Sequence, residues 1–409
     1  MADPSDDEWH LARTTATEYF QPAATVRDRK QILEWGKTPG HWSGNGKHTK
    51  FSDVKCKFHS DEILGHGGTG TVDRVTFRSV TMARKKIRVP GMFVQQFREE
   101  ANIMEKLVHR HIVELVGTYT HGQRELCILT YPAAICNLQG FLDDIEDIRN
   151  DTAADVKDSS KRFEALGFKN VVSSQGDLEL KSLDRPLHFL ASTLGCVTEA
   201  VTFVHKNGVR HQDLKPRNIL LSPQQVYLAD FGISRDLRDA THSLTEAFPG
   251  GTRSYLAPEV IEGEKHHMSP ADIYSLGCVL MTVATVLYAA PHEQYEMVMK
   301  EEDLTKKGIA VKEHIHDLRK RAEQLGKAAH DATTCAPKHL LGLIESMLQR
   351  DPEERPTACK VNSTLHELGG IDQVYHGKCC KRDSSYITQL IGKYSRSLIM
   401  FAEFLTCYR

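Results

Sequence analysis

The most informative stretch of the sequence is His211-Gln212-Asp213-Leu214-Lys215-Pro216-Arg217-Asn218. It continues as Ile219-Leu220-Leu221 and is followed after a short loop by Asp230-Phe231-Gly232. It places a carboxylate at 213, an amine at 215, an amide at 218 and a second carboxylate at 230. Phosphoryl transfer needs this set on one wall of a cleft, because these groups orient the attacking hydroxyl, face the phosphate and hold magnesium. Either block alone also fits an ordinary strand-turn-strand edge, but both blocks in this order favour a catalytic cleft.

The two blocks resemble the catalytic loop and the metal-binding loop of the eukaryotic protein kinases. By this resemblance, Asp213 accepts a hydrogen bond from the substrate hydroxyl and Lys215 stabilises charge on the γ-phosphoryl group. Asn218 and Asp230 are expected to ligate Mg²⁺. Lysine at the second position after the aspartate resembles the pattern of the serine/threonine members of the family. One residue departs from the pattern, because Gln212 stands where most members carry arginine.

A glycine-rich run, Leu64-Gly65-His66-Gly67-Gly68-Thr69-Gly70-Thr71-Val72, lies between two segments that are expected to be strands. Glycines let a backbone approach phosphates closely, although the run alone also fits a simple glycine-rich hairpin. Residues 73–78 continue as a strand, which argues against a dinucleotide-binding fold, where a helix would follow. The resemblance therefore predicts that this loop covers ATP.

The resemblance also assigns the residues around the nucleotide. Lys85, in a strand expected over 81–87, pairs with the phosphates, and its neighbour Lys86 is the alternative if the register is shifted by one. Glu100, in a helix predicted over 94–108, is expected to pair with Lys85, while Glu99 faces solvent. The expected ATP-binding residues are Leu64, Gly65, Gly67, Gly70, Val72, Ala83, Lys85, Thr130 and Ala133, with Tyr131 as the alternative to Thr130 at the gatekeeper position.

Further positions follow from the segment 251–259 (GTRSYLAPE) and from its C-terminal partner motif. Thr252 is expected to bridge Asp213 and Lys215. Glu259 is expected to form a buried ion pair with Arg355. The resemblance further predicts that Asp272 holds the catalytic-loop backbone, and that an apolar stack bridges the lobes. The members of this stack are Met104, Leu115, His211 and Phe231.

Gln212 bears on regulation, because the arginine usually found there grips an activating phosphate through a bidentate pair. A neutral glutamine cannot do so. We therefore expect a kinase that does not depend on phosphorylation of its activation loop, in which Ser234, Thr241, Ser243 and Thr245 are the candidate phosphorylation sites. The alternative is that another basic residue takes the role, for which the candidates are Arg210, Arg235 and Arg238.

Composition limits the other classes of function. A formal net charge of −2 argues against a protein that binds nucleic acid mainly through phosphate contacts. The acidic N-terminus excludes an ordinary signal peptide, and the apolar run 273–291 is expected to be a buried core helix rather than a membrane span.

The ten cysteines show no Cys-x-x-Cys pairing and indicate reduced core thiols of a cytoplasmic or nuclear protein. A metal role is the less favoured interpretation. Adjacent Cys379 and Cys380 are expected to be a surface feature without function, with lipidation or redox chemistry as alternatives.

The expected fold is α+β and bilobal, with a small β-rich N-lobe carrying one helix, a larger helical C-lobe, and ATP between them. Residues 58–368 form the kinase domain, with a mobile acidic insert at about 143–185. Residues 1–55 and 369–409 are expected to be tails. The first tail is predicted to be partly disordered, although Trp35 and Trp42 could anchor it on the domain surface. The N-terminal tail and the insert are the candidate docking segments for partners.

The predicted function is that of a Mg²⁺-dependent serine/threonine protein kinase, which transfers the γ-phosphoryl group of ATP to serine or threonine in protein substrates during intracellular signalling. The alternative is a pseudokinase that binds nucleotide and acts as a scaffold. All four chemical positions are filled, which favours the enzyme. A small-molecule kinase is disfavoured because residues 251–259 resemble a peptide-docking segment.

Overall fold

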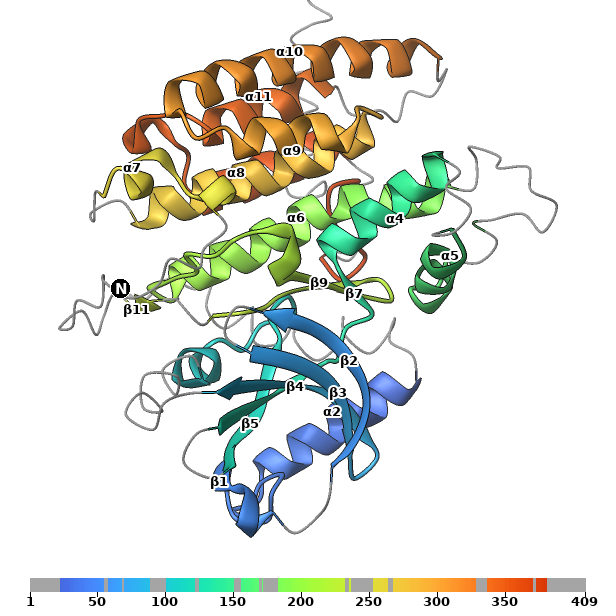
Figure 1. Cartoon of the computed structure of the whole chain (residues 1–409), viewed down its shortest axis with the longest axis vertical. Helices are drawn as coiled ribbons and strands as arrows, with labels where there is room; N and C mark the ends of the chain where they lie inside the picture. Colours follow the sequence, from blue (N-terminus) through green and yellow to red (C-terminus); the bar gives the residue numbers. More distant parts are fainter. Residues whose placement is uncertain are drawn as a thin grey trace, which may run out of the picture.

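The computed structural model describes residues 23–54, 58–67, 70–88, 101–121, 125–150, 156–168, 171, 183–231, 235–236, 253–263, 268–328, 337–370 and 373–380. Two lobes are evident in Figure 1, a β-rich N-lobe at the bottom (described residues up to 131) and a mainly helical C-lobe above it. The predicted α+β, bilobal fold is therefore confirmed.

The N-lobe is built on a six-stranded sheet in the order β1-β5-β6-β4-β3-β2. Its strands are β1 (His48–Lys50), β2 (His59–Gly67), β3 (Gly70–Phe77), β4 (Val80–Arg88), β5 (Glu114–His121) and β6 (Glu125–Tyr131). Side chains alternate between the two faces of a strand. In β6, Leu126 and Ile128 therefore join the core toward the C-lobe, whereas Cys127, Leu129 and Tyr131 join a second cluster on the outer face.

The outer face of the sheet is covered by the segment that sequence reasoning treated as a tail. Helix α2 (Ala23–Gly36) lies across the sheet in Figure 1, and it is followed by β1 and the short 3-10 helix η1 (Phe51–Asp53). Trp35 is 5 % exposed and Trp42 is fully buried among Phe58, Phe77 and Tyr119. The anchoring alternative is thus the correct one for residues 23–54, because the apolar outer face of β3 and β5 needs a cover.

The C-lobe is organised around two long, apolar helices, α6 (Asp184–Lys206) and α8 (Met268–Leu287). Both are long and apolar enough to span a membrane, but 78 % and 83 % of the respective windows are buried inside the fold. This confirms the expectation of a core helix for the run that begins at Ile273. The surrounding helices are α4 (Leu138–Asn150), α5 (Val156–Ala165), α7 (Pro258–Ile261), α9 (His292–Lys300), α10 (Leu304–Ala328), α11 (Pro337–Met347) and α12 (Ala358–Leu368), with the 3-10 helices η6 (Arg253–Tyr255) and η7 (Pro352–Glu354).

The expected mobile insert at 143–185 is partly folded, which corrects the prediction. Helix α5 packs on α4, where the buried Asp144 carboxylate accepts hydrogen bonds from Arg162 Nε at 2.8 Å and from Ser159 Oγ at 2.8 Å. Phe163 is fully buried beside Phe141. Because Asp144 is buried and paired, it does not belong to an acidic surface that could recruit a basic partner.

Part of the C-terminal segment also docks on the C-lobe. Residues 373–380 run along α6, and the Gly195 amide donates to the Tyr375 carbonyl at 2.7 Å. Cys379 and Cys380 are each only 7 % exposed, so the prediction that they lie on the surface is wrong. The sequence around them is basic and hydrophilic, and it gave no sign that the chain turns inward at this point.

Candidate active site

The catalytic-loop residues converge on the Asp213 carboxylate. The loop runs from β8 (Val209–Arg210) to the 3-10 helix η4 (Pro216–Asn218) and the hairpin β9 (Ile219–Ser222) and β10 (Gln225–Leu228). Lys215 Nζ lies 2.9 and 2.7 Å from the two Asp213 carboxylate oxygens. Asn218 Nδ2 donates to the Asp213 carbonyl at 2.8 Å and to Asp213 Oδ2 at 2.9 Å. Three of the predicted residues therefore form one hydrogen-bonded unit.

A buried carboxylate from α8 holds this loop from below, as predicted. Asp272 accepts hydrogen bonds from the backbone amides of His211 and Gln212, each at 2.8 Å. Its Oδ2 atom also lies 2.8 Å from Nε2 of His205, at the end of α6. Burial would raise the pKa of Asp272, but these partners outweigh it and keep the pKa below its ordinary value. The contact stabilises Gln212 in a left-handed conformation with φ of 66°.

The structure resolves the register of β4, where Lys85 and Lys86 were alternatives. Lys85 Nζ lies 2.7 Å from Asp230 Oδ1, across the space between the lobes. Lys86 Nζ instead lies 3.0 Å from Asp73 Oδ2 on the opposite face of the sheet. Burial would raise the pKa of Asp230, but the Lys85 ammonium group lowers it by more, so that this carboxylate is anionic. Lys85 is the lysine that faces the site.

The expected nucleotide-binding residues of β3, β4 and β6 lie on the same face of the N-lobe sheet as Lys85. Val72 pairs with Lys85 between β3 and β4, and Ala83 pairs with Thr130 between β4 and β6. A Cβ atom on Gly70 would lie 1.9 Å from the Lys86 carbonyl oxygen, so only glycine fits there. Leu64, Gly65 and Gly67 lie on β2, and Ala133 follows β6.

The side-chain alternation of β6 decides between the two gatekeeper candidates. Tyr131 is buried in the outer cluster with Trp35 and Trp42. Its neighbour Thr130 therefore faces the opposite side, next to Ala83. Thr130 is the residue that lines the interlobe face, as sequence reasoning favoured.

Two members of the predicted apolar stack, His211 and Phe231, are in contact, and the complete stack stays a prediction. Met104, Leu115 and Phe231 belong to the main hydrophobic core, and His211 packs on Phe231 with ring centroids 4.8 Å apart. His211 Nε2 also lies 3.0 Å from the Ala229 carbonyl oxygen. The loop that carries Asp213 and the loop that carries Asp230 are thus tied together at their bases.

The predicted ion pair between Glu259 and Arg355 is confirmed. Arg355 Nη1 and Nη2 lie 2.6 and 2.8 Å from the two Glu259 carboxylate oxygens, and both side chains are buried. Arg210, one of the alternatives for gripping a phosphate, directs its guanidinium group to Ser269 Oγ and to the carbonyls of Val209 and His205. Its donors are therefore engaged within the C-lobe.

Several predicted residues lie outside the described residues. They are Glu99, Glu100, Ser234, Arg238, Thr241, Ser243, Thr245, Gly251 and Thr252. The roles expected for Glu100 and Thr252 stay predictions. The side chain of Arg235, in β11 (Arg235–Asp236), is not described either.

Two supporting contacts escaped sequence reasoning. Asp73 is buried on the outer face of the sheet, where Arg84 Nε donates to its Oδ1 at 3.0 Å and Ser60 Oγ to its Oδ2 at 2.8 Å. The alternation of Arg84 and Lys86 on β4, on the face opposite to Lys85, was the available signal for a buried acidic partner. His205, which contacts Asp272, was read only as part of an amphipathic helix.

The donor set at the base of the cleft fits a hard divalent cation. Asn218 uses Nδ2 for both contacts with Asp213, so its amide oxygen is not used in them. The Asp230 side chain is 42 % exposed. Mg²⁺ prefers one or two such oxygen ligands together with substrate phosphates and water. Asn218 and Asp230 could therefore hold the ion between them.

Comparison with known proteins shows similarity to protein kinases. Residues 179–366 match the protein kinase domain family. The chain is 29 % identical over 242 residues to serine/threonine-protein kinase PknB of Mycobacterium tuberculosis, a match that covers 57 % of this chain and 33 % of that protein. It is 28 % identical over 234 residues to cyclin-dependent kinase D-1 of Arabidopsis thaliana, covering 55 % and 48 % respectively.

A third relative covers more of the chain. The LEAF RUST 10 disease-resistance locus receptor-like protein kinase-like 1.1 of Arabidopsis thaliana is 28 % identical over 324 residues, which is 77 % of this chain and 44 % of that protein. The chain thus spans between a third and a half of the length of these curated relatives.

Proposed function

The chain belongs to the eukaryotic-type protein kinase superfamily, and from this premise we propose that it is an active serine/threonine kinase that transfers the γ-phosphoryl group of ATP to a protein hydroxyl. The observation that carries the proposal is the network of Asp213, Lys215 and Asn218. A scaffold that had lost catalysis would have no need for a lysine, an amide and a carboxylate held within 3 Å of one another.

Each side chain has a distinct task in this proposal. Asp213 accepts a hydrogen bond from the attacking hydroxyl and orients its oxygen toward the phosphorus atom. Lys215, which lies on the same carboxylate, places its positive charge where negative charge grows on the transferred group. Catalysis of this kind depends on positioning and charge rather than on covalent assistance. Loss of any one group should therefore be severe.

Lys85 and Asp230 complete the charge arrangement on the other side of the cleft. When Mg²⁺ is bound, it neutralises the phosphate oxygens during transfer. Asp230 and Asn218 would hold this ion, and Lys85 would exchange part of its contact with Asp230 for the phosphates. The separation of 2.7 Å between Lys85 Nζ and Asp230 Oδ1 supports this, since both groups already meet at one point.

The contacts of Asp272 support the proposal that the activity does not depend on phosphorylation of the activation loop. It binds the loop backbone at His211 and Gln212, so the loop has a rigid support that does not involve the side chain at 212. Replacing Thr241, Ser243 and Thr245 together by alanine should leave the rate of peptide phosphorylation unchanged. A large loss of rate would show instead that a phosphate on this segment is required.

The decisive experiment is transfer of labelled phosphate from Mg-ATP to a mixed serine/threonine peptide library and to the protein itself. Asp213→Asn keeps the size of the side chain but removes its charge, and it should abolish transfer. Asp158→Asn is the matched control, because its carboxylate is 67 % exposed on α5, distant in the fold from the catalytic loop. This control should retain the wild-type rate.

The competing pseudokinase function predicts a different pattern. In that case the wild-type protein binds ATP in an equilibrium titration, yet neither it nor the Asp158→Asn variant transfers phosphate. Such a result would refute the proposed activity. Reverting Gln212 to arginine would then test whether this position alone disables the site.

The protein substrate and the location are part of the proposal. Lys215 and the segment 251–259 favour a serine or threonine in a polypeptide as the acceptor. We assign the protein to the cytoplasm or the nucleus, on the basis of its reduced cysteines. Fluorescence microscopy of the tagged protein in cells tests that assignment.

A further inference from the structure

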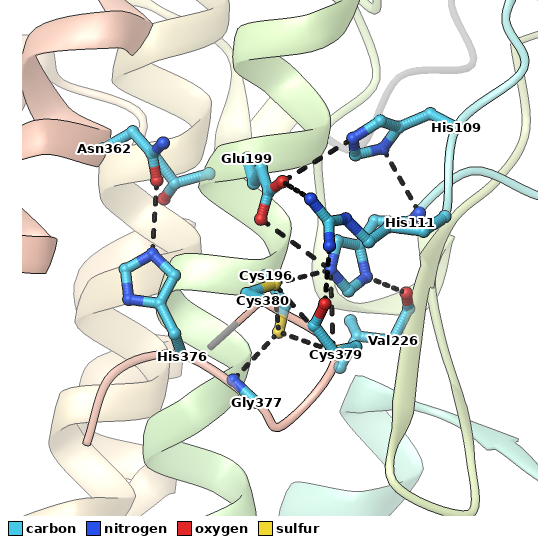
Figure 2. Close-up of polar contacts among 12 residues, drawn as sticks. His109, His111, Cys196, Glu199, Val226, Asn362, His376, Gly377, Cys379 and Cys380 are labelled. Carbon is cyan, nitrogen blue, oxygen red and sulfur yellow. Dashed lines mark hydrogen bonds and ion pairs between the residues drawn. The ribbon is translucent and has the colours of Figure 1, made fainter. Parts of the chain in front are cut away.

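A cluster of four ligand-type side chains lies where α6, the loop before β5 and the segment 373–380 meet. Figure 2 shows His111, Cys196, Cys379 and Cys380 directed toward one another from three separate segments of the chain. All four are buried, and His111 is 0 % exposed. Their Nε2 and Sγ atoms all lie within 4.8 Å of one another. None of these residues takes part in the proposed phosphoryl transfer.

Four of the distances within the cluster match the edges of a tetrahedral zinc site. With zinc–sulfur bonds of about 2.3 Å and tetrahedral angles, two thiolate sulfurs lie about 3.8 Å apart, and a sulfur and an imidazole nitrogen about 3.6 Å. The three Sγ–Sγ separations are 3.7 Å (Cys196 to Cys379), 3.6 Å (Cys196 to Cys380) and 3.8 Å (Cys379 to Cys380). His111 Nε2 lies 3.7 Å from Cys379 Sγ.

One edge is shorter than the others, at 2.8 Å between His111 Nε2 and Cys380 Sγ. This edge would lengthen by about 0.8 Å around a zinc ion. The sulfur separations also exclude disulfides within the cluster, because a bonded pair lies at about 2.05 Å. All three cysteines are free thiols.

The histidine is oriented as a metal ligand should be. His111 Nδ1 lies 2.8 Å from the carbonyl oxygen of Val226, which can only accept a hydrogen bond. A proton is therefore on Nδ1, which leaves Nε2 as the nitrogen that can offer a lone pair to a metal ion among the three sulfurs. A backbone or carboxylate oxygen on the second ring nitrogen is the usual support of a metal-binding histidine.

The backbone around the sulfurs also fits a site that binds a metal ion through thiolates. The Gly377 amide donates to Cys196 Sγ at 3.3 Å, and a hydrogen bond of this kind stabilises a thiolate. A Cβ atom on Gly377 would lie 3.0 Å from Cys379 Sγ, so glycine permits the close approach. Arg110 donates to the Cys379 carbonyl at 2.6 Å and to Glu199 Oε1 at 2.9 Å, which fixes the segment against α6.

We infer that His111, Cys196, Cys379 and Cys380 form a structural site for one zinc ion. Four ligands fill a tetrahedral shell, as in structural rather than catalytic zinc sites. Three thiolates and one imidazole also select a soft or borderline cation over Mg²⁺ or Ca²⁺. Each cysteine that binds releases its proton, so loading should release up to three protons per ion.

The ion would join three parts of the chain that are far apart in sequence. His111 precedes β5 in the N-lobe, Cys196 lies within α6, and the two adjacent cysteines close the C-terminal segment 373–380. A crosslink between such distant positions reduces the entropy of the unfolded chain more than a local one does. The site would thus fasten the C-terminal segment and the loop before β5 to the same helix.

The first test measures metal in the full-length protein, purified without chelators, by inductively coupled plasma mass spectrometry. One zinc per chain is expected in the wild type, and less than a tenth of that in Cys196→Ala and Cys380→Ala. Cys278→Ala is the matched control, because Cys278 is an equally buried thiol outside the cluster. It should keep its zinc.

A second test does not depend on the variants folding. A thiol reagent that absorbs on reaction is added to the native wild-type protein before and after a strong zinc chelator. Three additional thiols should react after chelation, and zinc should appear with them. Replacement of zinc by Co²⁺ should also give the intense visible absorption of a tetrahedral cobalt–thiolate site.

Other outcomes would overturn the inference. The first is a wild-type protein without bound metal, and the second is a chain that holds iron or copper in place of zinc. The third is a disulfide between Cys196 and Cys379 or Cys380, detected by mass spectrometry of peptides digested without reduction. Unchanged thiol reactivity after chelation would have the same meaning. Activity toward peptides is not used as a readout, so the outcome is independent of the proposed kinase function.

Discussion

Replacing Trp42 by alanine tests whether residues 23–54 are an integral part of the N-lobe. The indole ring is fully buried, with ring centroids 5.6 Å from Phe77 and 6.2 Å from Tyr119. Its Nε1 atom donates to the Lys47 carbonyl at 2.8 Å. A Cβ atom on Gly117 would lie 2.0 Å from Nε1, so the ring rests directly on the backbone of β5.

These contacts set the expected magnitude. Removal of about 250 Å² of buried tryptophan surface, at about 25 cal/mol per Å², gives an upper bound of about 6 kcal/mol. Measured truncations of buried tryptophan or phenylalanine to alanine cost about 3–5 kcal/mol. Because a strand backbone and aromatic rings wall the cavity, little collapse can fill it. We expect the free energy of unfolding of the N-lobe to fall by about 4 kcal/mol.

The assay uses the position of the tryptophans. All three, at 9, 35 and 42, precede the predicted start of the kinase domain, so the tryptophan fluorescence of the protein in urea reports on the chain before that domain. Leu33→Ala on the same helix is the control, because Leu33 is 55 % exposed and its loss should cost less than about 1 kcal/mol. A Trp42→Ala protein whose unfolding free energy lies within about 1 kcal/mol of the wild type would refute the reasoning.

Three further predictions concern the C-lobe. Arg355→Met should destabilise it by about 3–5 kcal/mol in urea unfolding, because Glu259 would be left as a buried, unpaired charge, whereas Arg355→Met with Glu259→Met should lose less. Burial lowers the pKa of His314 from 6.5 to about 4. The unfolded chain therefore binds this proton more readily, so stability should be full above about pH 6.5 and fall by roughly 3 kcal/mol as the pH drops toward 4. His314→Gln should flatten that part of a stability profile, and an unchanged slope would contradict the assignment. Asp272→Ala should lower kcat of peptide phosphorylation about 100-fold with little change in the KM for ATP, measured by steady-state kinetics, because only the loop support is lost.

The catalytic loop was predictable because its chemistry is local in sequence. Asp213, Lys215 and Asn218 lie within six residues, and a short loop with fixed spacing has few ways to arrange them. The register of β4 was the open question, since Lys85 and Lys86 have the same chemistry. Only the pairing with β3 and the contact with Asp230 could decide it.

The role of residues 23–54 could not be derived from the local pattern. The segment is rich in glycine and polar residues, which favours a loop when it is considered alone. Trp42 packs on Phe77 of β3 and Tyr119 of β5, which lie 35 and 77 positions farther along the chain. The burial of Asp144 was hidden in the same way, because Arg162 and Ser159 become its neighbours only when α5 folds back on α4.

The cysteine cluster could not be predicted from the sequence either, because its members are even farther apart along the chain. The search for paired cysteines at short spacing assumes that metal ligands are close in sequence. Here one ligand lies at 111, one at 196 and two at 379 and 380, and none has a nearby partner except the adjacent pair. The folded chain brings them together because Gly195 and Gly377 let the segment 373–380 approach α6 closely.

Helix α6 explains why these distant features share one part of the fold. Its polar side chains lie within an otherwise apolar core helix, where each needs a specific partner to compensate for burial. Cys196 contacts the sulfurs of the C-terminal segment, and Glu199 pairs with Arg110. His205 lies about 14 Å from Cys196 along the helix axis and contacts Asp272. Because Asp272 in turn holds the catalytic-loop backbone, a zinc ion that fixes α6 would act on the element that supports the loop, without touching the residues that are expected to bind ATP.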